Sequence, residues 1–227
     1  MRRLAMAEYA RMAPESNGDY RFPVVVTGVV LAAGRSERMG RPKALLELWG
    51  QSFLESVLAT MQSAGIVSRV VVAGPNADQV AALVPADTIL VSMGTGPHPI
   101  DSVRAGVRSA GDADAILVWP IDHPHVRSAT VRALLTAFRG ATTPIVAPSF
   151  HHRRGHPVIW ARATWPALLA AEVGEREGAR GVARLFPVRH VNVPDAAVVD
   201  DIDTPEAYAR LLAEREGRDS RPHSDGC

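Results

Sequence analysis

Hydrophobic and polar positions follow two periodicities along the chain. Short apolar runs rich in β-branched residues are typical of buried strands, and they lie near 24–32, 69–73, 88–92, 115–121, 143–148, 156–160 and 188–193. Between them, apolar residues recur at the three- and four-residue spacing of amphipathic helices, over 53–65, 76–84, 102–110, 128–138, 164–172 and 178–186. A last helix is predicted after Thr204, because Pro205 and Glu206 suit a first helical turn.

This regular alternation of strands and helices predicts the fold class. Strands joined through helices pair in parallel, and helices then cover both faces of the sheet. We therefore expect an α/β protein with three layers and a mostly parallel sheet. Ligands in such folds bind beyond the carboxyl ends of the strands.

The pattern extends over residues 23–213, which we interpret as a single domain. Residues 1–22 mix arginines with acids and lack the continuous apolar segment of a secretory signal, so they are predicted to be a flexible extension. Residues 214–227 are polar and rich in turn-forming residues, and a disordered tail is expected there.

Charge and composition exclude several classes of protein. The 25 Lys and Arg residues nearly balance 24 Asp and Glu residues, which argues against nucleic acid or a membrane surface as partner. No apolar run approaches the roughly 20 residues that span a bilayer. A hydrophobic content of 47% excludes a disordered chain. Cys227 is the only cysteine, which fits a reducing, cytoplasmic location.

The first strand ends in a glycine-containing basic loop, residues 31–43, with the sequence LAAGRSERMGRPK. Gly34 and Gly40 allow the backbone to approach a ligand closely. Backbone N–H groups in such a loop form a concavity for anions, and the arginine and lysine side chains suit phosphate oxygens. The spacing matches neither GxxxxGK[ST] nor GxGxxG. The loop is therefore interpreted as a polyphosphate site, with a solvated turn as the alternative.

Two acidic positions follow other predicted strands. Asp122 ends the apolar run AILVWPI, where a carboxylate can hold a divalent cation, although an aspartate there can also cap a turn. Residues 198–208 read VVDDIDTPEAY and bring three more carboxylates in front of a helix. A solvated acidic turn is the alternative for this segment. Magnesium prefers a few carboxylates together with substrate phosphates.

The order LAAG-x-S-x-RMG-x-PK resembles the signature of the MobA-like nucleotidyltransferase family, particularly its molybdenum cofactor cytidylyltransferase branch. Asp122 with Pro124, the order DIDTPE at 201–206 and the segment RRGHPVIW at 153–160 are similar to further motifs of that family. The resemblance implies a Rossmann-like α/β/α nucleotidyltransferase fold. It also implies transfer of a nucleoside monophosphate from an NTP, CTP or GTP in particular, to a small phosphorylated acceptor.

The same resemblance implies roles for individual residues. Lys43, Arg38 and Asp122 would be catalytic, and Asp122 and Asp201 would hold Mg²⁺, with Asp203 as the alternative to Asp201. His156 would contact the acceptor, as would His123, which stands where the family usually has Gln or Met. The nucleotide would be bound by Leu31, Ala32, Ala33, Gly34, Arg35, Ser36, Arg38, Met39, Gly40, Lys43 and Ser102. For Ser102, a helix cap is the alternative.

Three other functions stay open at this level. The histidines at 123, 125, 151, 152 and 156 suggest zinc, but no HExxH or Cys-His ligand spacing accompanies them. The acceptor can be molybdopterin, with a molybdenum enzyme as recipient of the product, or a sugar phosphate or another metabolite. A non-catalytic nucleotide- or molybdopterin-binding chaperone is the remaining alternative, against which the intact basic loop and Asp122 argue.

Overall fold

The computed structural model describes residues 24–94, 98–171 and 178–219. The predicted extension at 1–22 and the last residues of the predicted tail, 220–227, lie outside this part of the chain. Within it, no helix is both long and apolar enough to cross a membrane.

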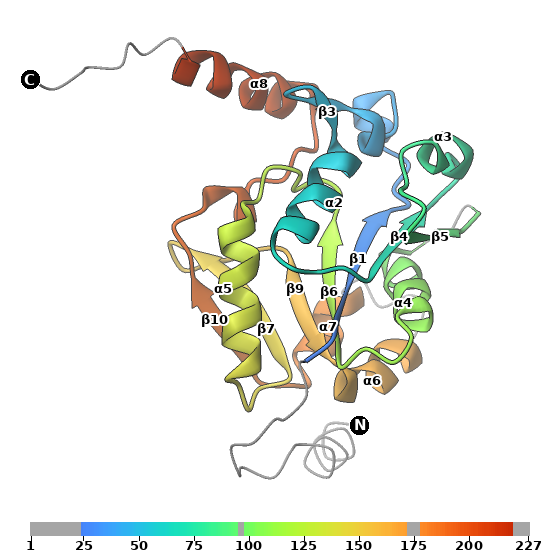
Figure 1. The fold of residues 1–227 in the computed structure, drawn as a ribbon, viewed down its shortest axis with the longest axis vertical. Coiled ribbons are helices and arrows are strands. Elements are labelled where there is room, and N and C mark those ends of the chain that lie inside the picture. Colours follow the sequence, from blue (N-terminus) through green and yellow to red (C-terminus); the bar gives the residue numbers. More distant parts are fainter. Residues whose placement is uncertain (1–23, 95–97, 172–177, 220–227) are drawn as a thin grey trace, which may run out of the picture.

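An eight-stranded mixed sheet forms the centre of the molecule (Figure 1). Its strand order is β10-β7-β9-β6-β1-β4-β5, with β8 beside β7. All neighbouring pairs along this order are parallel except those made by β9, and β8 is antiparallel to β7. The bounds are β1 Val26–Ala32, β4 Arg69–Ala73, β5 Thr88–Ser92, β6 Ala115–Pro120, β7 Ile145–Phe150, β8 Arg153–Arg154, β9 Val158–Ala161 and β10 Val188–Asn192. The predicted, mostly parallel sheet is confirmed.

Helices cover both faces of this sheet (Figure 1). One face carries α2 (Phe53–Ser63), α5 (Ser128–Arg139) and α8 (Pro205–Asp219), and the other carries α4 (Pro99–Ser109), α6 (Trp165–Ala170) and α7 (Gly178–Ala183). The remaining elements are α3 Ala77–Ala81, the short hairpin β2 Glu47–Leu48 with β3 Gln51–Ser52, and the 3-10 turns η1 Glu37–Met39, η2 Lys43–Leu45, η3 Arg162–Thr164 and η4 Ala196–Val199. The result is the predicted three-layer arrangement.

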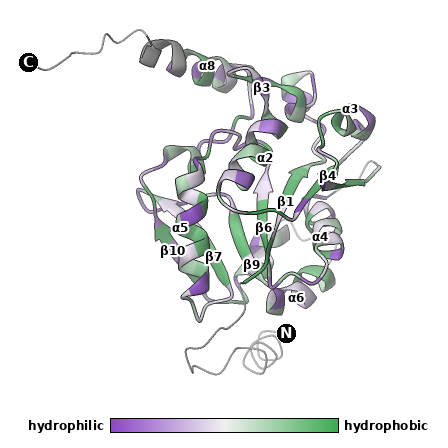
Figure 2. Ribbon diagram, in the orientation of Figure 1, coloured by the Kyte–Doolittle hydropathy of each residue, from purple (hydrophilic) through white to green (hydrophobic). Residues whose placement is uncertain are grey.

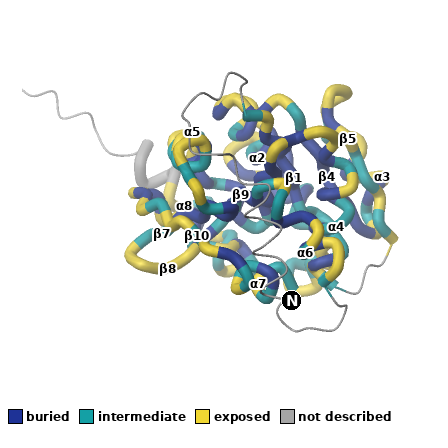
Figure 3. The backbone as a smooth tube through the Cα atoms, turned by 90° about the horizontal axis from the view of Figure 1, so that it is seen from below, coloured by how far each residue is buried: buried dark blue, intermediate teal, exposed yellow. Residues whose placement is uncertain are grey.

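The central strands are apolar on both faces because both are covered. Val29 and Ile116 belong to the core under α4, α6 and α7, whereas Val30 and Leu117 belong to the core under α2 and α5. Side chains that alternate along a strand in this way account for its unbroken apolar sequence. In Figures 2 and 3 the same strands are hydrophobic and buried, and exposed residues gather on helices and turns.

The predicted helix starts agree with the structure in part. Thr204 Oγ1 accepts a hydrogen bond from Ala207 N (3.2 Å) where α8 begins, as its sequence predicts. α8 continues to Asp219, beyond the predicted domain end at residue 213. α4 begins at Pro99 rather than at residue 102, because proline supplies the backbone angle of a first helical position. Ser102 is therefore inside the first turn, and the helix-cap alternative for it is wrong.

The helix α4 approaches β1 closely at Gly106. A Cβ atom on this glycine would lie 2.3 Å from Cγ1 of Val29, whose side chain is fully buried. A close approach of this kind holds α4 firmly over the strand that leads into the basic loop.

We expect Gly106→Ala to lower the free energy of unfolding by about 1–3 kcal/mol, because an extra methyl group overpacks a filled core. Urea unfolding monitored by circular dichroism measures the change. Gly140→Ala is the control, since a Cβ at this helix end would meet only Thr136 O, at 3.8 Å. Equal losses in the two variants would contradict close packing at Gly106.

Candidate functional site

The loop after β1 and the end of β6 meet at one edge of the sheet. Leu31 pairs with Pro120 in the parallel ladder, so both chains leave their strands side by side. A cavity of about 390 Å³ opens beyond them. It is lined by Leu31, Gly34, Arg35, Ser36, Glu37, Arg38, Lys43, Pro120, Ile121, Asp122 and Asp203.

Two short 3-10 turns shape the basic loop. Ser36 (φ 53°) and Gly40 (φ 68°) flank η1 in left-handed conformations, which reverse the chain. Ser36 Oγ accepts a hydrogen bond from Lys43 N at 3.1 Å and closes the loop. Ala44 and Leu46 are buried just beyond, so Lys43 starts from a fixed backbone.

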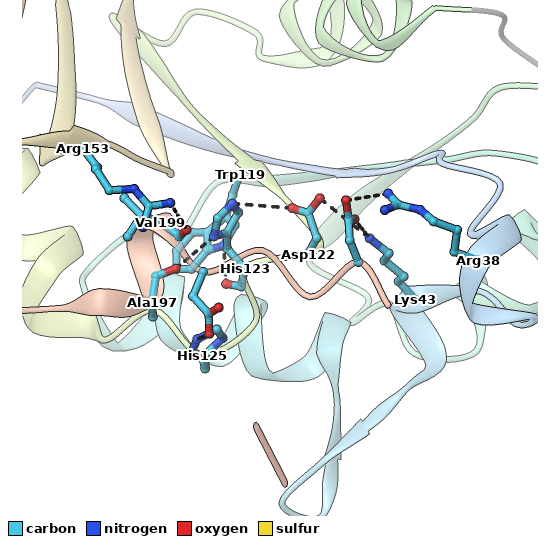
Figure 4. Close-up of polar contacts among 11 residues, drawn as sticks. Arg38, Lys43, Trp119, Asp122, His123, His125, Arg153, Ala197 and Val199 are labelled. Carbon is cyan, nitrogen blue, oxygen red and sulfur yellow. Dashed lines mark hydrogen bonds and ion pairs between the residues drawn. The ribbon is translucent and has the colours of Figure 1, made fainter. Parts of the chain in front are cut away.

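Lys43, Arg38 and two aspartates form one charged network (Figure 4). Lys43 Nζ donates to Asp203 Oδ1 and lies 3.9 Å from Asp122 Oδ2. Arg38 Nη2 donates to Asp203 Oδ2 at 2.6 Å. The network joins three chain segments that are far apart in the sequence, and it links the basic loop to both acidic positions.

The two aspartates of this network have opposite pKa shifts. Burial raises the pKa of Asp122, and electrostatic interactions with His123 and Lys43 only partly offset this rise. Burial acts in the same direction on Asp203, but hydrogen bonds and charge from Lys43 and Arg38 outweigh it and lower the pKa of that carboxyl. Asp203 is therefore ionised and fully engaged by the cations. A further positive charge nearby would stabilise the ionised form of Asp122.

The acidic segment is tied to Asp122 and to the neighbouring helices. Ile202 N donates to Asp122 O at 2.8 Å, which places residues 201–203 beside the end of β6. Upstream, the buried Asp195 accepts from Thr130 Oγ1 (2.6 Å) and from Arg127 N (3.0 Å) at the start of α5. These contacts explain why the acidic segment closes one side of the cavity.

The donor set fits a divalent cation held partly by substrate. Asp122 Oδ1 is buried without a hydrogen-bond partner, and Asp203 lines the same cavity. Asp201 is exposed and is not among the lining residues, although its charge also raises the pKa of Asp122. In the described part of the chain, no group of three or more His, Cys, Asp or Glu is arranged to hold a metal. A two-carboxylate site completed by phosphate oxygens is the arrangement that Mg²⁺ prefers.

His123 and His156 lie next to each other and contact η4. Their ring centroids are 5.4 Å apart, His123 Nδ1 is 2.9 Å from Ala197 O, and His156 N donates to Val198 O at 2.8 Å. Burial lowers the pKa of His156 to about 4, so this ring is neutral at pH 7. Among the described residues that line the cavity, neither histidine is present. Their contact with an acceptor stays a prediction, and His123 Nε2 lies 3.8 Å from Asp122 Oδ1.

The structure gathers seven of the predicted site residues around the cavity: Leu31, Gly34, Arg35, Ser36, Arg38, Lys43 and Asp122. Ala32, Ala33, Met39, Gly40 and Ser102 were also predicted there but do not line it. Met39 packs against the core, and Gly40 ends η1. Glu37 also lines the cavity but was not predicted as a site residue. Its position between Arg35 and Arg38 in the sequence could have indicated it.

Comparison with known proteins now defines the family. The MobA-like NTP transferase domain matches residues 28–193. A nicotine blue oxidoreductase from Paenarthrobacter nicotinovorans is 35% identical over 86% of this chain and all of its own length. A molybdenum cofactor guanylyltransferase from Xanthomonas euvesicatoria is 30% identical over 83% of this chain and 95% of its own length.

The same fold occurs in Rv0371c from Mycobacterium tuberculosis, with a TM-score of 0.72 and 32% identity. The match covers 84% of this chain and 99% of that one. Rv0371c has also been solved in complex with manganese. These relatives do not single out the cytidylyltransferase branch. Since the family domain extends from the middle of β1 to just beyond β10, the chain belongs to the MobA-like NTP transferase family of nucleotidyltransferases.

Proposed function

We propose that the chain is a Mg²⁺-dependent nucleotidyltransferase that transfers NMP from CTP or GTP to a small phosphorylated acceptor and releases pyrophosphate. One observation carries the proposal. A single cavity is lined both by the basic loop, with Ser36, Arg38 and Lys43, and by the carboxylates of Asp122 and Asp203. Phosphate-binding groups and a cation site on one cavity are what transfer from a triphosphate requires.

In this proposal the loop binds the donor triphosphate. The side chains of Arg35 and Arg38 are 63% and 65% exposed, so phosphate oxygens can reach them from solvent. Lys43 is only 12% exposed and points into the cavity, where its charge would stabilise the departing pyrophosphate.

Asp122 would hold Mg²⁺ together with Asp201 or Asp203. The geometry supports Asp203, which lines the cavity beside Lys43. When bound, the ion neutralises charge on the α- and β-phosphates. A nitrogen-rich zinc centre is not supported, because no group of three or more His, Cys, Asp or Glu among the described residues is arranged to hold a metal.

The transfer step then needs no nucleophilic side chain. A phosphate oxygen of the acceptor forms a bond to the α-phosphorus, and the bond from this phosphorus to the bridging oxygen breaks in line with it. Pyrophosphate leaves with the electron pair, and an ionised acceptor phosphate has no proton to lose. Positioning by the loop and the carboxylates supplies most of the rate gain.

The acceptor would approach Asp122 from the side of η4, away from Arg38. Arg153 lies on that side in Figure 4, and its Nη2 contacts Val199 O at 3.5 Å. Contacts of His123 and His156 with the acceptor remain part of the proposal, and the position of His123 supports it, because its Nε2 lies 3.8 Å from Asp122 Oδ1. The guanylyltransferase relative supports molybdopterin as acceptor and a molybdenum enzyme as recipient of the product. The oxidoreductase relative supports a second candidate function, turnover of nicotine blue.

We expect Lys43→Ala and Asp122→Asn to slow pyrophosphate release by about 10²–10³-fold, since each removes a group that stabilises transferring charge. A coupled pyrophosphate assay measures the rate with each of CTP, GTP, ATP and UTP. Arg41→Ala is the control, because Arg41 is an exposed residue of the same loop and does not line the cavity. Wild-type rates in both site variants would exclude the proposed mechanism.

A second experiment separates the candidate functions. Molybdopterin, a sugar phosphate and nicotine blue are each offered to the protein with NTP and Mg²⁺, and then with EDTA in place of Mg²⁺. We expect pyrophosphate release with one phosphorylated acceptor and its loss in EDTA, because Asp122 and Asp203 cannot replace the cation's charge. In a parallel assay with an added hydride donor such as NADH or NADPH, reduction of nicotine blue without pyrophosphate release would favour the oxidoreductase.

A further inference from the structure

Every basic side chain that lines the cavity is already paired with a carboxylate of the chain. Arg35 Nη1 lies 3.6 Å from Glu37 Oε1, Arg38 binds Asp203, and Lys43 binds Asp203 and lies near Asp122. The lining therefore contains three cations, Arg35, Arg38 and Lys43, and three carboxylates, Glu37, Asp122 and Asp203. With no net formal charge, the cavity does not attract anions by its total charge.

Asp203 has the central position in this balance. Its two carboxylate oxygens face different cations, Oδ1 toward Lys43 and Oδ2 toward Arg38. These are the donors that the basic loop would offer to phosphate oxygens. The carboxylate of Asp203 thus occupies the hydrogen-bonding groups that a triphosphate needs.

We infer that Asp203 makes the cavity selective for the metal-bound triphosphate over the metal-free anion. This inference rests on the proposed function. A metal-free triphosphate has to displace Asp203 from Lys43 and Arg38 and then faces unpaired carboxylates in a partly buried site. A divalent cation gives Asp203 and Asp122 a new partner, which releases both basic side chains for phosphate.

The two ligands are then coupled through one side chain. Because coupling between binding sites is reciprocal, triphosphate strengthens binding of the cation by the same factor by which the cation strengthens binding of triphosphate. Asp203 is accordingly a specificity-determining residue as well as a candidate ligand. The cavity would bind metal-free polyphosphate more weakly, although three basic residues line it.

Inorganic tripolyphosphate tests this inference without any choice of base or acceptor. Its binding to the full chain is measured by isothermal titration calorimetry, once in EDTA and once in excess Mg²⁺. For the wild type we expect at least about tenfold tighter binding in Mg²⁺, within the usual range of coupling between sites. For Asp203→Asn we expect tighter binding than wild type in EDTA and less than about threefold gain from Mg²⁺.

Glu37→Gln is the matched control. It removes one negative charge from the same cavity, but Arg35 is the one ion-pair partner of Glu37 among the described residues, and the Glu37 side chain is 76% exposed. Mg²⁺ should therefore increase the affinity of Glu37→Gln for tripolyphosphate by the same factor as in the wild type. If Glu37→Gln and Asp203→Asn tightened binding in EDTA equally, total charge would explain the result and the inference would be lost.

The wild-type comparison stands even if a variant is unstable, and thermal melting checks the fold of each. Equal wild-type binding in EDTA and Mg²⁺, or no binding in either, overturns the inference. Pyrophosphate release from NTPs is assayed on the same preparation. The expected binding pattern without such release under any acceptor would remove the proposed reaction and keep the metal-selective cavity. Pyrophosphate release together with equal binding of tripolyphosphate in EDTA and in Mg²⁺ would keep the proposed reaction and remove the metal-selective cavity.

Discussion

The parallel pairing of β1 with β6 is the constraint on which the site depends. It sets Leu31 opposite Pro120, so the basic loop and Asp122 leave the sheet as neighbours. The pairing is stabilised from both faces, since Val29 and Ile116 pack under one set of helices and Val30 and Leu117 under the other. Shifting the register by one residue would turn these side chains to the wrong faces. The location of the cavity is thus a consequence of core packing.

The acidic segment depends on a different set of contacts. Asp195 is anchored at the start of α5, Ile202 donates to the main chain of Asp122, and Thr204 caps α8. These contacts restrict the backbone of the acidic segment, and Asp203 is therefore held between Arg38 and Lys43. A loop held at both ends can place a carboxylate accurately while its solvent-facing part remains able to move.

Charge compensation gives the site its chemical character. The lining carries as many carboxylates as basic groups, and burial makes Asp122 receptive to a further positive charge. A polyphosphate and a divalent cation satisfy this arrangement together better than either does alone. The site therefore differs from a purely basic phosphate cradle, although its loop sequence is that of one.

The sequence by itself determined the strand and helix order, the mostly parallel sheet and the basic loop after the first strand, because hydrophobic periodicity and turn residues are local properties of the chain. Its motifs also identified Asp122. Only the tertiary structure decided that Asp203 rather than Asp201 lines the cavity, that Glu37 joins it, and that His123 and His156 contact η4. The physical reason is that DIDTPE offers two aspartates with the same chemistry. The choice between them depends on the hydrogen bond from Ile202 N to Asp122 O, which joins residues far apart in the sequence and which no local pattern encodes.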